Sequence, residues 1–362
     1  MRPGLLATTI SATLIIGCAH DCGRSPPERK AAGTSASSAQ PSPGSSPSHH
    51  PGPSLATAPA FEPQLATACS GTVVRGTVRA YVAGESIEER NRFVEAPFLP
   101  DGSLNERGGG EARNDNDEYG WALPMAARLR IRDRSLAMCF VGSSPWTDSN
   151  GGDYSGTWPS SSPGMTSSIA GTSIGSWLDE GDRERKLPGR RQELMQRKHC
   201  YDVAFASRGG NDLNNDVSDG EYLTSLVTLI KLLLDGSSCH AAHDPPAVYV
   251  TAHLPDRADL PSQERVFHKL TRSAYEQVRA DASLPQNKRN RIHFVDMHGA
   301  FQANLPTRAF PKPKWFSGSG FDMSSIGHVG DSGHPRRLAS IYAGEIAADA
   351  LDLAELRALA GK

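Results

Sequence analysis

The chain has 362 residues and a formal net charge of −2, with 38 lysines and arginines against 40 aspartates and glutamates. This near balance excludes binding of nucleic acid through an overall excess of positive charge, so we expect no nucleic-acid partner. No run of eighteen or more apolar residues occurs, so the sequence has no segment typical of a membrane-spanning helix. Hydrophobic residues make up only 38% of the chain, and the low share comes from its N-terminal part.

The chain begins with a segment typical of an export signal. One arginine precedes a short apolar run that ends at Ile15-Ile16-Gly17-Cys18. That tetrapeptide resembles the bacterial lipobox, in which the cysteine is lipidated after the signal is cleaved. We therefore predict a signal peptide over residues 1–17 and a membrane anchor at Cys18. The chain would then be an exported bacterial lipoprotein of the cell envelope, on the periplasmic or cell-surface side of the outer membrane. An ordinary signal peptide with an incidental cysteine is the alternative.

A segment rich in small and rigid residues follows the signal. Within residues 31–60, 24 of 30 positions are Ser, Ala, Pro or Gly. Such a composition buries too little apolar surface to offset the entropy lost on ordering, so we predict a disordered tether over residues 18–68. The folded domain then spans residues 69–362, which is long enough for one substantial core.

In the folded domain, apolar runs with strand character alternate with segments of helical length. This alternation favours an α/β fold in which a parallel sheet has helices on both faces. In such folds the functional site lies at the carboxyl ends of the strands. We predict strands at Val73–Val82, Ser135–Val141, Tyr201–Ala206, Ala247–Thr251 and Ile292–Val295. We predict helices at Trp121–Arg130, Glu221–Leu234, Ser262–Ala280 and Pro335–Leu359.

Four cysteines lie in the folded domain, and an even number in an exported domain indicates two disulfides. Cys69 precedes the first predicted strand and Cys139 lies in the second. Cys200 opens the third strand, and Cys239 follows the helix that returns from it. Of the three pairings that four cysteines allow, we predict Cys69–Cys139 and Cys200–Cys239. Reduced core thiols are the alternative. The spacing of Cys and His is not that of a zinc site, and we expect no metal.

Four short polar motifs lie just beyond predicted strands or at the start of the last helix. Gly84-Glu85-Ser86 follows the first strand, and Ala170-Gly171-Thr172 lies in the long loop after the second. Gly209-Gly210-Asn211-Asp212 follows the third strand, and Asp331-Ser332-Gly333-His334-Pro335 opens the last helix. Each motif alone is common by chance, but all four in this order form a specific pattern.

With these motifs, residues 72–359 resemble the SGNH (GDSL) hydrolases, a family of esterases, lipases and carbohydrate acetylesterases. The resemblance implies a three-layer α/β/α domain around a central, mostly parallel, flavodoxin-like sheet of about five strands. Two positions depart from the family pattern: a glutamate replaces the aspartate of the first motif, and the usual asparagine before the second-motif glycine is missing. The resemblance implies a catalytic triad of Ser86, Asp331 and His334 and an oxyanion hole formed by Ser86, Gly171 and Asn211.

The residue types fit acyl transfer. A serine hydroxyl becomes a strong nucleophile when an imidazole takes its proton, which is the role of His334. Asp331, three residues away, can orient the ring and stabilise its charge. The N–H groups of Ser86 and Gly171 and the Asn211 carboxamide can donate to the oxyanion that forms on the attacked carbonyl. This chemistry needs no cofactor, and we expect none.

A second serine also lies in a motif typical of a nucleophile. Residues 171–175 match the G-x-S-x-G elbow of α/β-hydrolases, with Asp296 and His334 following in the right order. That elbow needs a firm strand before it, whereas a Ser/Pro/Gly-rich stretch precedes Ser173. We therefore favour Ser86.

Three further polar features are weighed and given no catalytic role. Residues 212–216 resemble part of a calcium loop but lack the glycine and glutamate that an EF-hand needs, so we interpret them as a polar loop covering the site. His298 and His328 are alternative bases, but each is more typical of a surface or hydrogen-bonded loop histidine.

The tryptophans near the motifs bear on the substrate. Trp146 and Trp158 lie in the loop after the second strand, Trp177 follows the second motif, and Trp315 precedes the last one. Exposed rings beside a pocket suit stacking on sugars, so we predict Trp146, Trp158 and Trp315 as substrate-binding residues. Packing of the loops is the alternative.

The sequence thus predicts an exported, lipid-anchored, monomeric serine esterase whose substrate is a small-molecule or polysaccharide ester, with an O-acyl or O-acetyl carbohydrate preferred. Two alternatives stay open. The first is a hydrolase of lipids, acyl chains or thioesters on the same scaffold. The second is a non-catalytic glycan-binding lipoprotein that keeps the fold.

Overall fold

The computed structural model describes residues 69, 71–85, 88, 96–99, 101–103, 105, 120–145, 165–183, 186–240, 244–254, 264–304 and 337–361. All of them belong to the compact unit Ala58–Lys362. Cys18, the predicted signal peptide and the predicted tether lie outside the described residues. Among the helices that the structure describes, none has the length and apolar character that crossing a bilayer requires.

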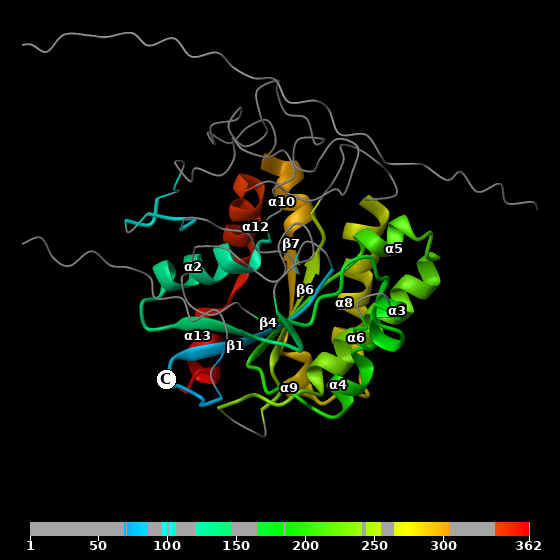
Figure 1. Ribbon diagram of the computed structural model, residues 1–362, viewed down its shortest axis with the longest axis horizontal. Helices are drawn as coiled ribbons and strands as arrows, with labels where there is room; N and C mark the ends of the chain where they lie inside the picture. Colours follow the sequence, from blue (N-terminus) through cyan, green and yellow to red (C-terminus); the bar gives the residue numbers. More distant parts are fainter. Residues whose placement is uncertain are drawn as a thin grey trace, which may run out of the picture. The chain divides into compact units, whose positions relative to one another are not determined.

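A five-stranded sheet forms the centre of this unit (Figure 1). Its order is β2-β1-β5-β6-β7, and every neighbouring pair is parallel. Taken in chain order, this is the 2-1-3-4-5 arrangement of flavodoxin-like doubly wound sheets, so the predicted sheet is confirmed. The strands are β1 (Thr77–Ala83), β2 (Ala137–Val141), β5 (Val203–Ser207), β6 (Ala247–Ala252) and β7 (Ile292–Asp296), and a separate antiparallel pair joins β3 (Ser144–Pro145) to β4 (Met165–Thr166).

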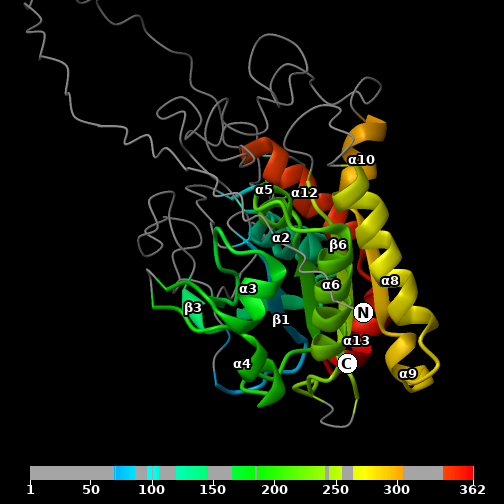
Figure 2. The same cartoon turned by 90° about the vertical axis from the view of Figure 1, so that its right-hand side faces the viewer.

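Helices cover both faces of the sheet, which confirms the three-layer α/β/α architecture (Figures 1 and 2). One face packs against α2 (Ala122–Arg132), α10 (Met297–Asn304), α12 (Arg337–Ala350) and α13 (Leu353–Leu359). The other face packs against α3 (Ile174–Asp179), α4 (Arg191–Met195), α6 (Asp219–Leu234) and α8 (Thr271–Ala280). Both views show α6 and α8 side by side. The remaining elements are α5 (Gly210–Asn214), the π-helix η1 (Glu264–Leu270) and α9 (Gln286–Arg289).

Local signals explain why α6 begins and ends where it does. The Ser218 side chain accepts a hydrogen bond from the Glu221 N–H, and two acidic residues occupy the first turn. Lys231 lies in the last turn, where it complements the helix dipole. The leucines and isoleucine of one face are buried against the sheet, as the amphipathic spacing predicts.

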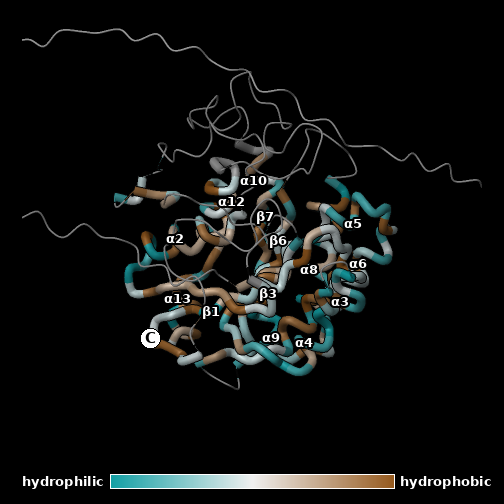
Figure 3. Tube along the Cα trace, viewed as in Figure 1, coloured by the Kyte–Doolittle hydropathy of each residue, from teal (hydrophilic) through white to brown (hydrophobic). Residues whose placement is uncertain are grey.

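Side chains of each strand alternate between two cores. In β1, Val78, Ala80 and Val82 join the core beneath α2 and α12, whereas Tyr81 and Ala83 join the core beneath α6. Because both faces are covered, most strand positions are apolar, and the exceptions such as Arg79 in β1 and His293 in β7 are only partly buried. Figure 3 shows the hydropathy of each residue along the chain.

The first strand begins later than the sequence predicts. Val73 and Val74 are exposed, and the Thr77 N–H donates to Val74 O in a tight turn. Gly76 adopts a φ of +81° in that turn, which strongly favours glycine. β1 therefore starts at Thr77 rather than at Val73.

Two helical predictions also need correction. The single helix predicted at the C-terminus is divided, because Asp352 accepts hydrogen bonds from the Ala354 and Glu355 N–H groups and so starts α13 as a new helix. The segment predicted as a polar loop at residues 212–216 is helical as far as Asn214, where α5 ends.

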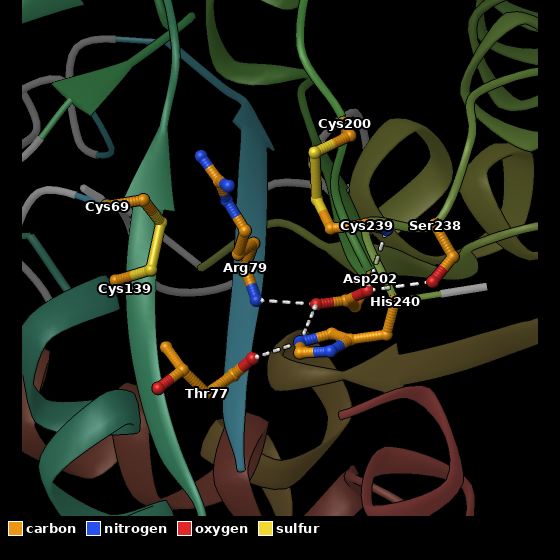
Figure 4. Close-up of a disulfide and its surroundings, with 9 residues drawn as sticks. All are labelled: Cys69, Thr77, Arg79, Cys139, Cys200, Asp202, Ser238, Cys239 and His240. Carbon is orange, nitrogen blue, oxygen red and sulfur yellow. Dashed lines mark hydrogen bonds and ion pairs between the residues drawn. A yellow bond between two sulfur atoms is a disulfide. The ribbon is translucent and has the colours of Figure 1, made fainter. Parts of the chain in front are cut away.

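The structure forms both predicted disulfides, Cys69–Cys139 and Cys200–Cys239, each with a Cα–Cα distance of 5.0 Å (Figure 4). The first ties the chain entering the domain to β2. The second ties the start of β5 to the segment after α6. Both pairs join neighbouring elements near the sheet, as the strand positions of the cysteines predict.

A buried carboxylate lies beside the second disulfide (Figure 4). Asp202 is fully buried, and its Oδ2 accepts a hydrogen bond from the Arg79 N–H at 2.9 Å. Its Oδ1 accepts from Ser238 Oγ at 2.8 Å and from the Cys239 N–H at 3.0 Å. The carboxylate therefore joins β1, the start of β5 and the segment after α6.

We predict that Asp202→Ala lowers the free energy of unfolding by about 3 kcal/mol, because three donors, one of them buried and two partly buried, lose their acceptor. Urea unfolding followed by circular dichroism measures this change. Asp244→Ala, at an exposed position nearby, is the control and is expected to change stability by less than about 0.5 kcal/mol. Equal effects of the two substitutions would contradict the role given to Asp202.

Candidate functional site

The strand order reverses between β1 and β5, and the chain leaves these two strands toward opposite faces of the sheet. α2 follows β1 on one face, and α6 follows β5 on the other. Doubly wound folds bind their ligands at the carboxyl ends of the strands beside such a reversal. Gly84 and Glu85 follow β1 at this point, and residues 208–212 follow β5. The first and third predicted motifs therefore meet here.

The Glu85 carboxylate joins the carboxyl ends of three strands. Its Oε1 accepts a hydrogen bond from the Gly210 N–H and its Oε2 one from the Asn211 N–H, both at 2.8 Å. His253, the first residue after β6, places Nε2 2.7 Å from Oε1. Only 2% of Glu85 is exposed, so these partners replace water. The carboxylate thus fixes the backbone that carries the Asn211 side chain.

Glu85 and His253 form a buried ion pair. Burial by itself favours the neutral form of each group, but their mutual attraction outweighs it. The charges of His253 and Arg208 and the Asn211 N–H lower the pKa of Glu85 to about 2 against the effect of burial. Against the same effect, Glu85 and then Glu88 raise the pKa of His253 to about 9. The carboxylate and the imidazolium are therefore both charged at neutral pH.

The ring nitrogens of His253 are both occupied. Nδ1 lies 2.8 Å from Leu254 O, and Nε2 faces Glu85. His298, weighed as an alternative base, places Nε2 3.0 Å from a Glu264 carboxylate oxygen, which confirms its interpretation as a hydrogen-bonded histidine. Neither histidine is thus available as a general base for a nucleophile beside Glu85.

A second carboxylate, Glu88, supports the first. Its Oε2 accepts a hydrogen bond from the Glu85 N–H at 2.9 Å. Its Oε1 accepts from Trp121 Nε1 at 2.8 Å and from Ser207 Oγ at 2.6 Å. Burial raises the pKa of Glu88. Donors from three separate parts of the chain satisfy this carboxyl group, which therefore holds the turn after β1.

The second motif reaches the same edge. The Ile169 N–H donates to Gly84 O at 3.3 Å, so this segment passes beside the end of β1. A few residues later the Ile174 N–H donates to Asp212 Oδ1 at 2.9 Å, which joins the start of α3 to α5. Burial raises the pKa of Asp212 to about 6. Gly171 lies in the chain between these two attachments.

Two hydrogen-bond donors at this edge have no acceptor among the residues that the structure describes. Asn211 Nδ2 is buried and unpartnered, and within the described part of the chain the Gly171 N–H donates to no other residue. Gly171 has a φ of +74°, and a Cβ atom at this residue would meet nothing within 4 Å. Gly171 is exposed, so water can reach its N–H, whereas a buried donor without a partner, such as Asn211 Nδ2, is rare because it is costly. Donors that are left free at a carboxyl edge can serve an anionic group of a ligand.

The structure therefore brings Gly171 and Asn211 to one edge, beside the turn after β1. Ser86 directly follows Glu85 in the chain, and α12 begins three residues after His334. Among the residues that the structure describes, no three His, Cys, Asp or Glu side chains are placed to bind a metal ion. The other predicted site residues lie outside the described residues: Ser86, Asp331, His334, Trp146, Trp158, Trp315 and the alternative base His328.

Ser173 has the position of a helix cap rather than that of an elbow nucleophile. It follows a loop after the short strand β4, and its Oγ accepts a hydrogen bond from the Ser176 N–H at 3.3 Å at the start of α3. Trp177 is fully buried and donates from Nε1 to Ser167 O at 2.7 Å. Packing is therefore the correct interpretation of Trp177.

Arg208 and His253 belong to this edge, although no motif contains them. Each is the first residue after a buried strand, β5 or β6, at the edge where the sequence analysis expects the site. The signal that identifies them is a charged side chain directly after an apolar run. The sequence pattern marks Glu85 only as a departure from the aspartate of the SGNH motif, and the structure shows which groups its side chain reaches.

No protein-family model and no curated protein matches the sequence. Among solved structures, an acetylxylan esterase from Geobacillus stearothermophilus matches at 14% identity over 79% of this chain and 96% of that one, with a TM-score of 0.41. A carbohydrate acetylesterase from Sinorhizobium meliloti matches at 15% identity over 75% and 97%, with a TM-score of 0.37. A G-D-S-L family protein from Desulfitobacterium hafniense matches at 9% identity over 76% and 99%, with a TM-score of 0.38. Identities this low transfer no residue roles.

We predict that His253→Gln changes how stability depends on pH. The folded pKa of His253, about 9, lies above its ordinary 6.5, so its charge contributes stability fully below pH 6.5, and this is lost as pH rises through about 9. The folded pKa of Glu85, about 2, lies below its ordinary 4.5, so its contribution is present above pH 4.5 and is lost as pH falls through about 2.

Urea unfolding of both proteins from about pH 5 to 9.5 measures this effect. The difference in the free energy of unfolding between wild type and variant should be largest below pH 6.5 and should shrink toward pH 9. A difference that stays constant over this range would contradict the ion pair.

Proposed function

We propose that this chain is an exported serine esterase that cleaves a carboxylic ester, namely an O-acyl or O-acetyl group on a carbohydrate. Ser86 is its nucleophile, His334 its base, and Asp331 orients and stabilises the base. The observation that carries the proposal is the buried Asn211 Nδ2, which has no partner among the described residues, at the same edge as the exposed Gly171 N–H and beside the turn that leads into Ser86.

Three further observations support this proposal. The residues before Ser86 lie at the reversal of strand order, where doubly wound folds bind ligands. The helix α12 begins three residues after His334. It packs against α10, the helix that follows β7. Two disulfides are typical of a protein exported to an oxidising compartment, which supports an export signal. The lipid anchor at Cys18 is part of the proposal and rests on the sequence of residues 15–18.

In the proposed reaction, the Ser86 hydroxyl oxygen attacks the ester carbonyl carbon while His334 takes the hydroxyl proton. The carbonyl oxygen becomes an oxyanion, which accepts hydrogen bonds from the Ser86 N–H, the Gly171 N–H and the Asn211 carboxamide. The bond to the alcohol then breaks, and His334 returns the proton to the departing oxygen. Water repeats the sequence on the acyl-enzyme, with His334 as base, and releases the acid and free Ser86.

Wild-type protein is expected to hydrolyse p-nitrophenyl acetate and to release acetate from acetylated polysaccharides. Ser86→Ala should remove nearly all of this turnover, because the nucleophile is lost. A fluorophosphonate probe followed by peptide mapping should label Ser86. Ser173→Ala is the control and should retain activity, because the Ser173 hydroxyl caps α3.

The outcomes distinguish the competing functions. Labelling of Ser173 with Ser86 untouched would overturn both the nucleophile and the mechanism. A clear preference for octanoate over acetate esters would favour a lipid or acyl-chain hydrolase. Absence of turnover on all esters, together with binding of glycans, would favour a non-catalytic lipoprotein.

We predict that Asn211→Ala lowers kcat by about 10²–10³-fold with little change in KM, because the Asn211 carboxamide donates to charge that develops only in the transition state. Steady-state kinetics on p-nitrophenyl acetate measures both constants. Asn214→Ala, an exposed asparagine on the same helix α5, is the matched control and should leave both unchanged. An increase in KM alone would show that Asn211 binds the ground-state substrate instead.

A further inference from the structure

We infer that Arg208 is a positioning residue whose buried guanidinium holds the loop that carries Gly171 in register with the turn that leads into Ser86. The inference rests on the proposed function and deepens it, because it gives Arg208 a task in building the oxyanion hole. Arg208 directly follows β5 and lies three residues before Asn211. Arg208 therefore directly precedes the third motif, and its side chain reaches the first and second motifs.

The two terminal nitrogens of the guanidinium reach two different loops. Nη1 donates to the carbonyl of Gly84, and Nη2 donates to the carbonyl of Thr172. Nη2 also lies 3.1 Å from Thr172 Oγ1, which donates in turn to Ile169 O at 2.8 Å. Gly84 lies two residues before Ser86, and Thr172 lies one residue after Gly171. One side chain therefore connects the backbone beside two of the proposed oxyanion donors.

The surroundings of Arg208 indicate that this side chain positions the neighbouring loops rather than adding to the stability of the fold. The side chain is 0% exposed, and its guanidinium carbon lies 5.7 Å from the centre of the Trp177 ring. Among the described residues, no carboxylate forms a direct ion pair with it, although its charge favours the ionised forms of Glu85 and Asp212. Burying a cation without a direct counter-charge costs free energy, so a packed apolar residue would serve stability better.

An arginine is required because the task needs two donors at a fixed separation. The planar guanidinium presents its donors as a rigid fork, whereas a lysine ammonium is a point charge on a flexible stem. Oxyanion donors must already point at the developing charge before reaction. A displacement of about 1 Å of a positioned group can cost about 10²-fold in rate.

The test compares Arg208→Met and Arg208→Lys with Arg190→Met in the full chain. Arg190 is the matched control because it is 1% exposed and donates to Ser144 Oγ at 2.8 Å and to Glu193 Oε2 at 3.4 Å. It forms no hydrogen bond to Gly84 or Thr172. Two readouts are measured: kcat and KM on p-nitrophenyl acetate, and amide hydrogen exchange of peptides covering residues 169–174.

We expect Arg208→Met to lower kcat about 10²-fold with KM changed little, and to speed hydrogen exchange at residues 169–174. Arg208→Lys should recover part of the lost kcat, because it keeps the charge and a donor group but not the rigid fork that reaches both carbonyls. Arg190→Met should leave kcat within about twofold and exchange in this segment unchanged, although it also removes a buried arginine.

Each remaining outcome counts against the inference. Exchange at residues 169–174 that is the same in Arg208→Met and wild type would show that Arg208 does not hold the loop. A kcat loss no greater than that of Arg190→Met would show that holding the loop has no part in catalysis. If wild-type protein turns over no ester, the proposed function fails and the catalytic part of the inference fails with it, while hydrogen exchange still decides whether Arg208 holds the loop.

Discussion

The Glu85 carboxylate is the interaction on which the carboxyl edge of the sheet depends. It accepts the N–H groups of Gly210 and Asn211 and faces the His253 ring, so one buried side chain connects the ends of β1, β5 and β6. Without its charge, two backbone donors and a buried cation would lose their partner.

Several buried charges lie at the two ends of the sheet strands. Glu85, Glu88 and Arg208 gather at the carboxyl edge beside the reversal of strand order, and Asp202 lies at the amino end of β5. Buried ion pairs add little stability compared with packed apolar side chains. They do fix distances, because each charged group needs its partners at hydrogen-bond range. The charged groups at the carboxyl edge thus stabilise the fold less than apolar side chains would, but they fix the positions of the Gly171 loop and of α5.

Sequence patterns predict most of the fold, because they reflect local forces. Apolar runs identify all five strands of the sheet, and helical periodicity identifies the main helices. The errors occur where a single residue decides a boundary: the glycine with positive φ at Gly76 delays β1, and the cap at Asp352 divides the last helix. Disulfide pairing is also predictable, since Cys69 and Cys139 belong to neighbouring elements.

The sequence by itself determined that Asn211 would follow a strand at the carboxyl edge, because parallel strands share a carboxyl end, and the resemblance of the second motif implied that Gly171 would meet it there. Only the tertiary structure decided which charged residues support them. Arg208 donates to Gly84 across 124 positions of the chain, and Glu85 reaches Asn211 across 126. Such partners depend on strand order and on the direction in which each helix leaves the sheet, and neither is encoded in a local pattern of residues.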